Sequence, residues 1–387
     1  MAGKLKLWLC TFLAAASIAS VAHGEESKSL VLLPQNKLLT RPIGAAVQAD
    51  NITFLNMQEA DGFYSRAIRL NPEVAENYLK RGQALMYLKK YNEALEDFAT
   101  VVKLEPKNAE GLYWMGEAYN NLGKTQEALK FLEKSLALEP GDYFTWAYRA
   151  SIYREKLKKY DLAIADFSRA LKLKPDYQDG YMYRAASYAA LNKIDAGIKD
   201  MSKAIALKPD DAELYSKRGW FYIGNKQYDL AVADFTKAIE MKSDDYTNYA
   251  NRGRAYFNKK LYKEAANDFC TALESKPDDI NMLNLLAYSQ LYQKRCQLAL
   301  DIINTAIKLQ PDTPQIIDSR GEIYEGMKRY EEALAEYKIS EEMLIKEKDE
   351  ESLKEIRMHI NRVKGKMTKA EHKKQNCDKI QGKYLAK

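Results

Sequence analysis

Prolines recur every 34 residues along most of this chain. Pro72, Pro106 and Pro140 are 34 residues apart. With one step of 35 residues, and with Ser243 where one proline would fall, the series continues through Pro175, Pro209, Pro277 and Pro311. Self-similarity at a fixed period of this length predicts an array of repeated units, because one unit alone cannot bury its apolar face and must stack on its neighbours.

Each period predicts a pair of antiparallel helices. Tyr249, Gly253 and Tyr256 lie three or four residues apart, which places them on one face of a first helix. Ala265 and Phe269 mark the facing stripe of a second helix. The small residues at 253 and 265 let the two helices approach closely, and the proline ends the unit because it cannot continue a helix.

This pattern resembles the tetratricopeptide repeat family. The match extends in register over residues 75–347, in units that begin at Ala75, Ala109, Tyr143, Gln178, Ala212, Tyr246, Ile280 and Pro314. The third unit carries one extra turn residue, between Tyr153 and Tyr160. Residues 41–74 fit a degenerate partial repeat, in which Ala60, Tyr64 and Ala67 match the second helix and residues 41–55 match the first helix poorly.

The resemblance implies an all-α fold, a right-handed superhelical solenoid of antiparallel helix hairpins with a long concave face. After the eighth unit an apolar stripe at helical spacing continues to Val363, and it predicts a C-terminal capping helix over residues 348–374. Residues 375–387 are expected to form a basic tail. The simplest interpretation of that tail is a solvated segment, and the alternative is weak attraction to an anionic surface.

The first 24 residues have the layout of a cleaved secretory signal. Lys4 and Lys6 give a positive start, and residues 7–22 are apolar or small. Sixteen residues of helix span only ~24 Å, less than the ~30 Å hydrocarbon core of a bilayer, which disfavours the alternative of a membrane anchor. We therefore expect residues 1–24 to be removed, residues 25–40 to form a linker, and the protein to be periplasmic or secreted rather than an integral membrane protein.

An arginine and an acid are present or absent together within each unit. The pairs are Arg81 with Asp97, Arg149 with Asp166, Arg184 with Asp200, Arg218 with Asp234, Arg252 with Asp268, and Arg320 with Glu336. The two units without the arginine have Met115 and Leu286, and they hold Phe131 and Ile302 in place of the acid. This covariation within units predicts an Arg–carboxylate ion pair inside each hairpin, replaced as a set by apolar contacts.

In the family that this chain resembles, the first helices line the concave face and bind extended peptides or partner helices. Interface hot spots favour Trp, Tyr and Arg. We predict a partner-binding groove lined by Tyr113, Trp114, Tyr148, Tyr183, Lys217, Trp220, Asn251, Arg254, Phe257, Tyr288 and Tyr292. The alternative is that tyrosine simply fills space, since the chain has 27 of them. The carboxylate clamp of chaperone-binding members is absent, because its positions here hold Leu79, Gln83, Trp114, Phe144 and Tyr148.

The sequence contains no recognisable motif for catalysis, cofactor binding or metal binding. It has no glycine-rich phosphate loop, and its histidines have no metal-ligand spacing with a cysteine pair, so we expect no cofactor, no metal and no enzymatic activity. A net charge of +6 over 387 residues gives no reason to expect specific nucleic-acid binding. Of the three cysteines after the signal, a bridge between Cys270 and Cys296 is disfavoured, and the odd count leaves a free thiol or an intermolecular bond at Cys377 or another of the three.

These features together predict a non-catalytic scaffold for protein–protein interaction, located in the periplasm or outside the cell, which binds a partner peptide or helix in an aromatic concave groove. The alternative is a regulatory or targeting subunit of an envelope-associated enzyme complex, in which the chemistry belongs to a partner chain.

Overall fold

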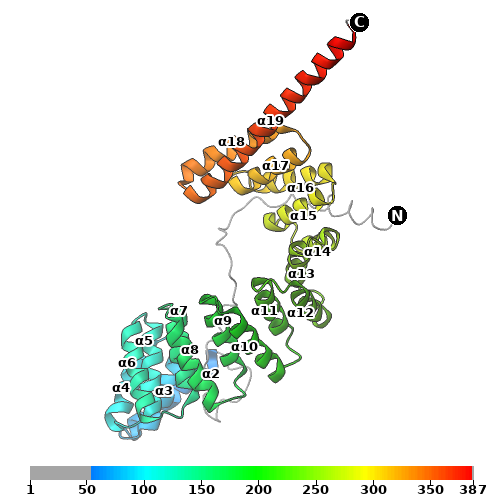
Figure 1. Ribbon diagram of the computed structural model, residues 1–387. Coiled ribbons are helices and arrows are strands. Elements are labelled where there is room, and N and C mark those ends of the chain that lie inside the picture. Colours follow the sequence, from blue (N-terminus) through cyan, green and yellow to red (C-terminus); the bar gives the residue numbers. More distant parts are fainter. Residues whose placement is uncertain (1–53, 386–387) are drawn as a thin grey trace. The chain divides into compact units, whose positions relative to one another are not determined.

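The computed structural model describes residues 54–385, and the side chains of residues 57–369. These residues form 18 helices and no strand, so the predicted all-α fold is confirmed. The predicted signal peptide, linker and first part of the partial repeat lie outside the described residues. The helices (Figure 1) are α2 Phe54–Leu70, α3 Ala75–Tyr87, α4 Tyr91–Leu104, α5 Ala109–Asn121, α6 Thr125–Leu138, α7 Tyr143–Glu155, α8 Tyr160–Leu173, α9 Gln178–Ala190, α10 Ile194–Leu207, α11 Ala212–Gly224, α12 Tyr228–Met241, α13 Tyr246–Asn258, α14 Tyr262–Ser275, α15 Ile280–Tyr292, α16 Cys296–Leu309, α17 Pro314–Gly326, α18 Tyr330–Glu347 and α19 Glu350–Leu385.

Consecutive helices pair into hairpins, from α3 with α4 to α17 with α18. The first helices of these hairpins begin at the same residues as the sequence repeats. The described chain divides into two compact units, residues 54–209 with helices α2–α10 and residues 210–385 with helices α11–α19. Within each unit, the second helix of one hairpin packs on the first helix of the next, as expected of a solenoid.

Aspartate and asparagine side chains cap the first helices. Asp245 Oδ1 accepts a hydrogen bond from the backbone N–H of Thr247 at 3.0 Å, and Asp279 accepts one from Met282 at 3.0 Å. Such a side chain satisfies one of the free N–H groups of the first turn, and its negative charge suits the positive end of the helix dipole. The residues that cap a first helix in this way are Asn108, Asp142, Asp211, Asp245 and Asp279.

The turn inside each hairpin depends on one left-handed residue. At Lys260, φ is +63°, and the N–H of the following Leu261 donates to the carbonyl of Tyr256 at 2.9 Å. This is the Schellman arrangement, which satisfies the last carbonyls of the first helix. A glycine holds the position in only one of these eight turns; in chain order the residues are Lys89, Gly123, Lys158, Asn192, Lys226, Lys260, Lys294 and Lys328. The extra residue of the third repeat lengthens the connection between α7 and α8.

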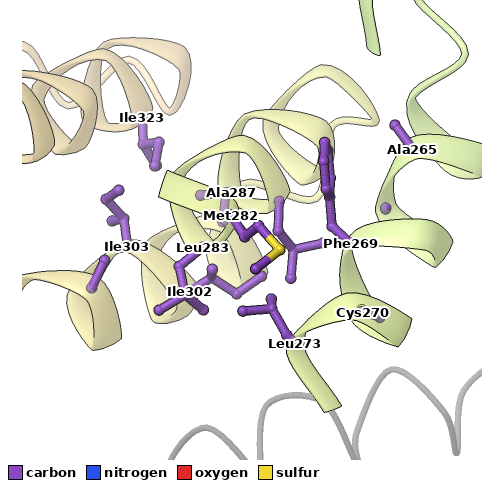
Figure 2. Close-up of a cluster of buried hydrophobic side chains, with 14 of the residues drawn as sticks. Ala265, Phe269, Cys270, Leu273, Met282, Leu283, Ala287, Ile302, Ile303 and Ile323 are labelled. Carbon is purple, nitrogen blue, oxygen red and sulfur yellow. The ribbon is translucent and has the colours of Figure 1, made fainter. Parts of the chain in front are cut away.

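The core consists of one large residue from each second helix and the small residue that faces it. A Cβ atom built on Gly253 would lie 2.9 Å from Cε1 of Phe269, so this close approach requires glycine. Figure 2 shows Phe269 of α14 beside Met282 and Leu283 of α15, with Ile303 of α16 on the far side of α15. The buried residues of these three helices form one hydrophobic cluster, so the core continues from one hairpin to the next.

The C-terminal helix α19 differs from the capping helix that the sequence predicts. It begins at Glu350, after Lys348 has taken a left-handed conformation, and it continues to Leu385. Residues 375–385, predicted as a tail, are therefore helical, and they contain no proline that would end the helix. The first part of α19 packs Ile356, Ile360 and Val363 onto α18.

Candidate interaction surface

Each of the six arginines bonds to the acid of its own hairpin. Arg252 donates from Nε to Asp268 Oδ2 and from Nη2 to Oδ1, both at 2.8 Å. Four other Arg–Asp pairs are bidentate in the same way, and Arg320 donates to Glu336 through Nη2 alone, at 2.7 Å. The hydrogen bond to Asp268 raises the pKa of Arg252, which keeps the pair charged despite its burial. These arginines therefore join the two helices of their hairpins.

Four of these arginines also reach the preceding repeat, which the sequence analysis missed. Nη1 of Arg252 donates to the Thr236 hydroxyl at 3.1 Å, and the corresponding partners of Arg81, Arg184 and Arg320 are Ser65, Ser168 and Asn304. Each partner stands 16 residues before its arginine. At the same spacing before Met115 and Leu286 the sequence has Ala99 and Cys270, which is the signal that could have revealed this contact.

Three of the predicted groove residues are buried, so the prediction that they line an accessible surface is wrong. The side chains of Tyr113, Trp114 and Tyr148 are 0%, 2% and 2% exposed. Trp114 stacks on Phe98 of the preceding hairpin with ring centroids 5.9 Å apart, and Tyr113 packs edge-on against both Trp114 and Tyr148. The Tyr148 hydroxyl accepts a hydrogen bond from Asn120 at 3.1 Å, and burial raises its pKa. These rings fill the core of the first unit.

Tyr183, Lys217 and Asn251 are half-buried. Tyr183 stacks on Phe167 at 6.1 Å, and the guanidinium of Arg154 lies 5.0 Å from its ring centroid. Lys217 forms an ion pair with Glu213 at 2.6 Å. Like Trp114 and Tyr148, these three residues occupy the sixth position of their repeats. At that position the rings of Trp114 and Tyr183 turn towards the second helix of the preceding hairpin, which explains why the position is covered.

The other five predicted residues form one continuous surface on the second unit, which we call the aromatic strip. It consists of Trp220 on α11, Arg254 and Phe257 on α13, and Tyr288 and Tyr292 on α15. The Arg254 guanidinium lies 5.3 Å from the ring centroid of Trp220, Phe257 lies 6.0 Å from Tyr292, and Tyr288 stacks on Tyr292 at 6.1 Å. Trp220 is 41% exposed and Tyr292 is 48% exposed. The strip therefore crosses three first helices and offers apolar area to solvent.

The deep end of the strip is fixed by hydrogen bonds. The Tyr288 hydroxyl donates to Glu322 at 2.7 Å and lies 3.1 Å from the Ser319 hydroxyl, both on α17. Burial, and the negative charge of Glu322, raise the pKa of Tyr288, so the phenol stays neutral. Tyr288 is consequently a rigid wall of the strip, whereas Tyr292 is its exposed member.

A metal site needs several ligating side chains close together. Among residues 57–369, no group of three or more His, Cys, Asp or Glu residues is placed to hold a metal ion. None of the helices described between residues 54 and 385 is both long enough and apolar enough to cross a membrane. Cys270 is buried, Cys296 is half-buried, and no disulfide joins these two described residues.

Comparisons with known proteins agree with the fold. A family model described as tetratricopeptide repeat matches residues 79–143 and 148–212, and a second model of that description matches residues 212–245 and 246–279. Together they cover more than half of the 387 residues. No curated protein sequence matches the chain.

Two solved structures share the fold. The C-terminal part of a TPR repeat-containing protein from Cytophaga hutchinsonii is 21% identical, with a TM-score of 0.55 over 62% of this chain and 98% of that one. A tetratricopeptide repeat protein from Parabacteroides merdae is 19% identical, with a TM-score of 0.51 over 66% of this chain and 98% of that one. MamA from Desulfovibrio magneticus RS-1 is 26% identical, with a TM-score of 0.41 over 44% of this chain and 97% of that one.

Proposed function

Because the chain belongs to the tetratricopeptide repeat family, we propose that it is a non-catalytic scaffold that binds a protein or peptide partner along the aromatic strip. The observation that carries the proposal is the exposure of Trp220 on α11 and Tyr292 on α15, with the Arg254 guanidinium beside Trp220. Trp, Tyr and Arg are the residues that most often dominate binding energy at protein interfaces. Their rings are already held by neighbouring rings, so little side-chain freedom is lost when a partner docks.

The proposal includes the location of the protein. The positive, apolar and small-residue pattern of residues 1–24 supports export by a cleaved signal peptide, and hence a partner in the periplasm or outside the cell. N-terminal sequencing of the protein recovered from the cells that make it tests this. A mature chain that begins at Glu25 is the expected result, and an intact Met1 end would contradict it.

A pull-down with variants of the strip tests the binding surface. Trp220→Ala and Tyr292→Ala should each weaken capture of the partner by about 30-fold, the effect of losing an interface hot spot of ~2 kcal/mol. Phe63→Ala is the matched control, because Phe63 is a 58% exposed aromatic residue on α2 and belongs to the other compact unit of the chain. If the control variant loses the partner as strongly as the strip variants do, the strip is not the binding surface.

A second variant separates the strip from the C-terminal segment. Deleting residues 371–387 keeps Ile356, Ile360 and Val363, which pack α19 on α18. Under the proposal this deletion leaves capture unchanged. Loss of the partner on deletion, with capture intact in Trp220→Ala, would move the binding site to the basic end of α19.

A further inference from the structure

One arginine of the first helices differs from the six that bond to acids. Arg254 is exposed, and no carboxylate of the described residues lies within ion-pair distance, 4.0 Å, of its guanidinium. Arg252, two residues earlier on the same helix, is bonded to Asp268 through two nitrogens. The contrast appears in their pKa values: the acid raises the pKa of Arg252, whereas desolvation without a close acid lowers that of Arg254.

The position of Arg254 is set by an aromatic ring. Its guanidinium lies 5.3 Å from the ring centroid of Trp220, within the range of a cation–π contact. Trp220 in turn packs edge-on against the buried Phe235 at 6.4 Å, which holds its indole in place. The cation therefore sits at an ordered position with its N–H donors available, and a planar guanidinium of this kind can bind a carboxylate through two hydrogen bonds.

The acid whose charge acts on Arg254 is already engaged. Asp279, whose charge acts on Arg254 from a distance, caps α15 by accepting the N–H of Met282 at 3.0 Å, and Lys276 lies 3.8 Å from its carboxylate. On α11, Glu213 is bonded to Lys217 at 2.6 Å. The positive charge of Arg254 therefore has no ion-pair partner among these acids.

An apolar platform lies one helical turn further along α13. Phe257 follows Arg254 by three residues, so the two side chains share a face and stand ~5–6 Å apart at their Cβ atoms. The Phe257 ring contacts Tyr292 at 6.0 Å and Tyr262 at 5.5 Å. In an extended peptide, residues i and i+2 point the same way and lie ~6.6–6.8 Å apart, so a carboxylate and an aromatic side chain two residues apart lie on one face of the peptide.

We infer that the strip selects an extended acidic peptide segment, in which a carboxylate side chain binds Arg254 over Trp220 and an aromatic side chain two residues away packs on Phe257 and Tyr292. The inference rests on the proposed function and specifies the partner for it. Charge complementarity is its main support, because the peptide supplies the anion that the structure does not place beside Arg254.

Synthetic peptides test the inference on the full mature chain. The probes are three fluorescein-labelled 12-residue peptides with blocked ends, of glycine and serine apart from one Asp-Ser-Phe, Asn-Ser-Phe or Lys-Ser-Phe motif. Fluorescence anisotropy at about 0.15 M salt measures each dissociation constant. We expect the Asp peptide to bind about tenfold or more tightly than the Asn peptide, as for a hydrogen bond to a charged group, and the Lys peptide to bind more weakly still.

Two variants locate the effect. Arg254→Gln should remove the preference for Asp over Asn. Arg329→Gln is the matched control, because Arg329 is exposed and lies 4.7 Å over the ring of Tyr324 but is bonded to Glu332 at 2.8 Å; the preference should survive there. An equal loss in both variants would mean that general charge, and not the Arg254 site, attracts the peptide, which overturns the inference.

The remaining outcomes separate this inference from the proposed function. Equal binding of the Asp and Asn peptides, with both weakened by Trp220→Ala, overturns the acidic preference and leaves the strip as a binding surface. Preference for the Lys peptide also overturns it. If none of the three peptides binds, the inference fails, and the pull-down with Trp220→Ala and Tyr292→Ala still decides whether the strip binds a partner.

Discussion

Arg252 and Asp268 form a bidentate ion pair between the two helices of one hairpin, with both N···O distances at 2.8 Å. Asp268 is 7% exposed, so an uncompensated carboxylate would remain there if the arginine were lost. Removing one partner of a buried pair is far more harmful than replacing both with apolar residues. The hairpin of α15 and α16 already shows the apolar version of the pair, with Leu286 and Ile302.

We therefore predict that Arg252→Leu lowers the free energy of unfolding by about 2–4 kcal/mol, somewhat below the value for a fully buried pair because Arg252 is partly exposed. The double variant Arg252→Leu/Asp268→Ile should recover most of that loss. Urea denaturation followed by circular dichroism measures both. A double variant as unstable as Arg252→Leu alone would show that the two sites do not act as a set.

The contact between Gly253 and Phe269 leads to a second prediction. A methyl group on Gly253 would meet the Phe269 ring at 2.9 Å, so Gly253→Ala should destabilise the protein by about 1–3 kcal/mol, as overpacking does. Adding Phe269→Ile copies the pairing of Ala287 with Ile303 in the next hairpin and should restore stability. Thermal unfolding of the single and double variants checks this, and a neutral Gly253→Ala would contradict the close approach.

Stability can also be gained at the hairpin turns. Lys260 has a φ of +63°, a conformation that is unfavourable for any residue with a Cβ atom by about 1 kcal/mol. Lys260→Gly should therefore raise the free energy of unfolding by up to about that amount. Lys263→Gly makes the same change within α14, where helix propensity predicts a loss of about the same size. Equal effects of the two variants in urea denaturation would mean that the turn conformation is not strained.

The docking of α19 should depend on pH through His359. This residue is 8% exposed, and its Nδ1 lies 2.9 Å from Asp318 on α17. Glu322 and Arg362 also face it, and its ring contacts Tyr337. The hydrogen bond with Asp318 raises the pKa of His359 above its ordinary value. Its contribution to docking is therefore complete below an unfolded pKa of about 6.5 and is lost as the pH rises through the higher folded value.

Hydrogen exchange of the backbone amides of residues 356–363, corrected for the intrinsic effect of pH, measures this docking. Protection should fall between pH 6 and pH 9 in the native chain. In His359→Gln, which keeps a hydrogen-bond donor but does not titrate, protection should no longer change through the histidine range. An identical fall in the variant would assign the pH dependence to other groups.

The sequence predicted the hairpins because their signals are local and periodic. The starts of the first helices depend on caps such as Asp245 and on the apolar spacing within one repeat. The ion pairs could be predicted because the arginine at the position of Arg252 and the acid at the position of Asp268 are present together or absent together in each repeat. Comparison between repeats thus supplied information that a single unit would not contain.

The surface was harder to predict, because exposure depends on what the neighbouring hairpin places opposite a residue. Trp114 and Trp220 both stand on first helices, but Trp114 packs against Phe98 and Tyr113 and is 2% exposed, whereas Trp220 packs against Phe235 and Arg254 and stays 41% exposed. Their positions in the repeat, sixth and ninth, differ, but position alone does not decide exposure, because Gln83 and Glu117 at the ninth position are buried whereas Trp220 is exposed.

The arginine that joins one hairpin to the preceding one has a consequence for how the array responds to ionic strength. Junctions such as that at Thr236 and Arg252 include a polar contact from a charged group, whereas those at Ala99 with Met115 and at Cys270 with Leu286 lack the arginine. Added salt screens the charged contact at the junctions that have the arginine, although less strongly than on an open surface. A salt that is excluded from the protein surface, such as sulfate, strengthens the apolar burial at the junctions that lack it. Contacts between hairpins should therefore weaken at some junctions and strengthen at others as the salt concentration changes.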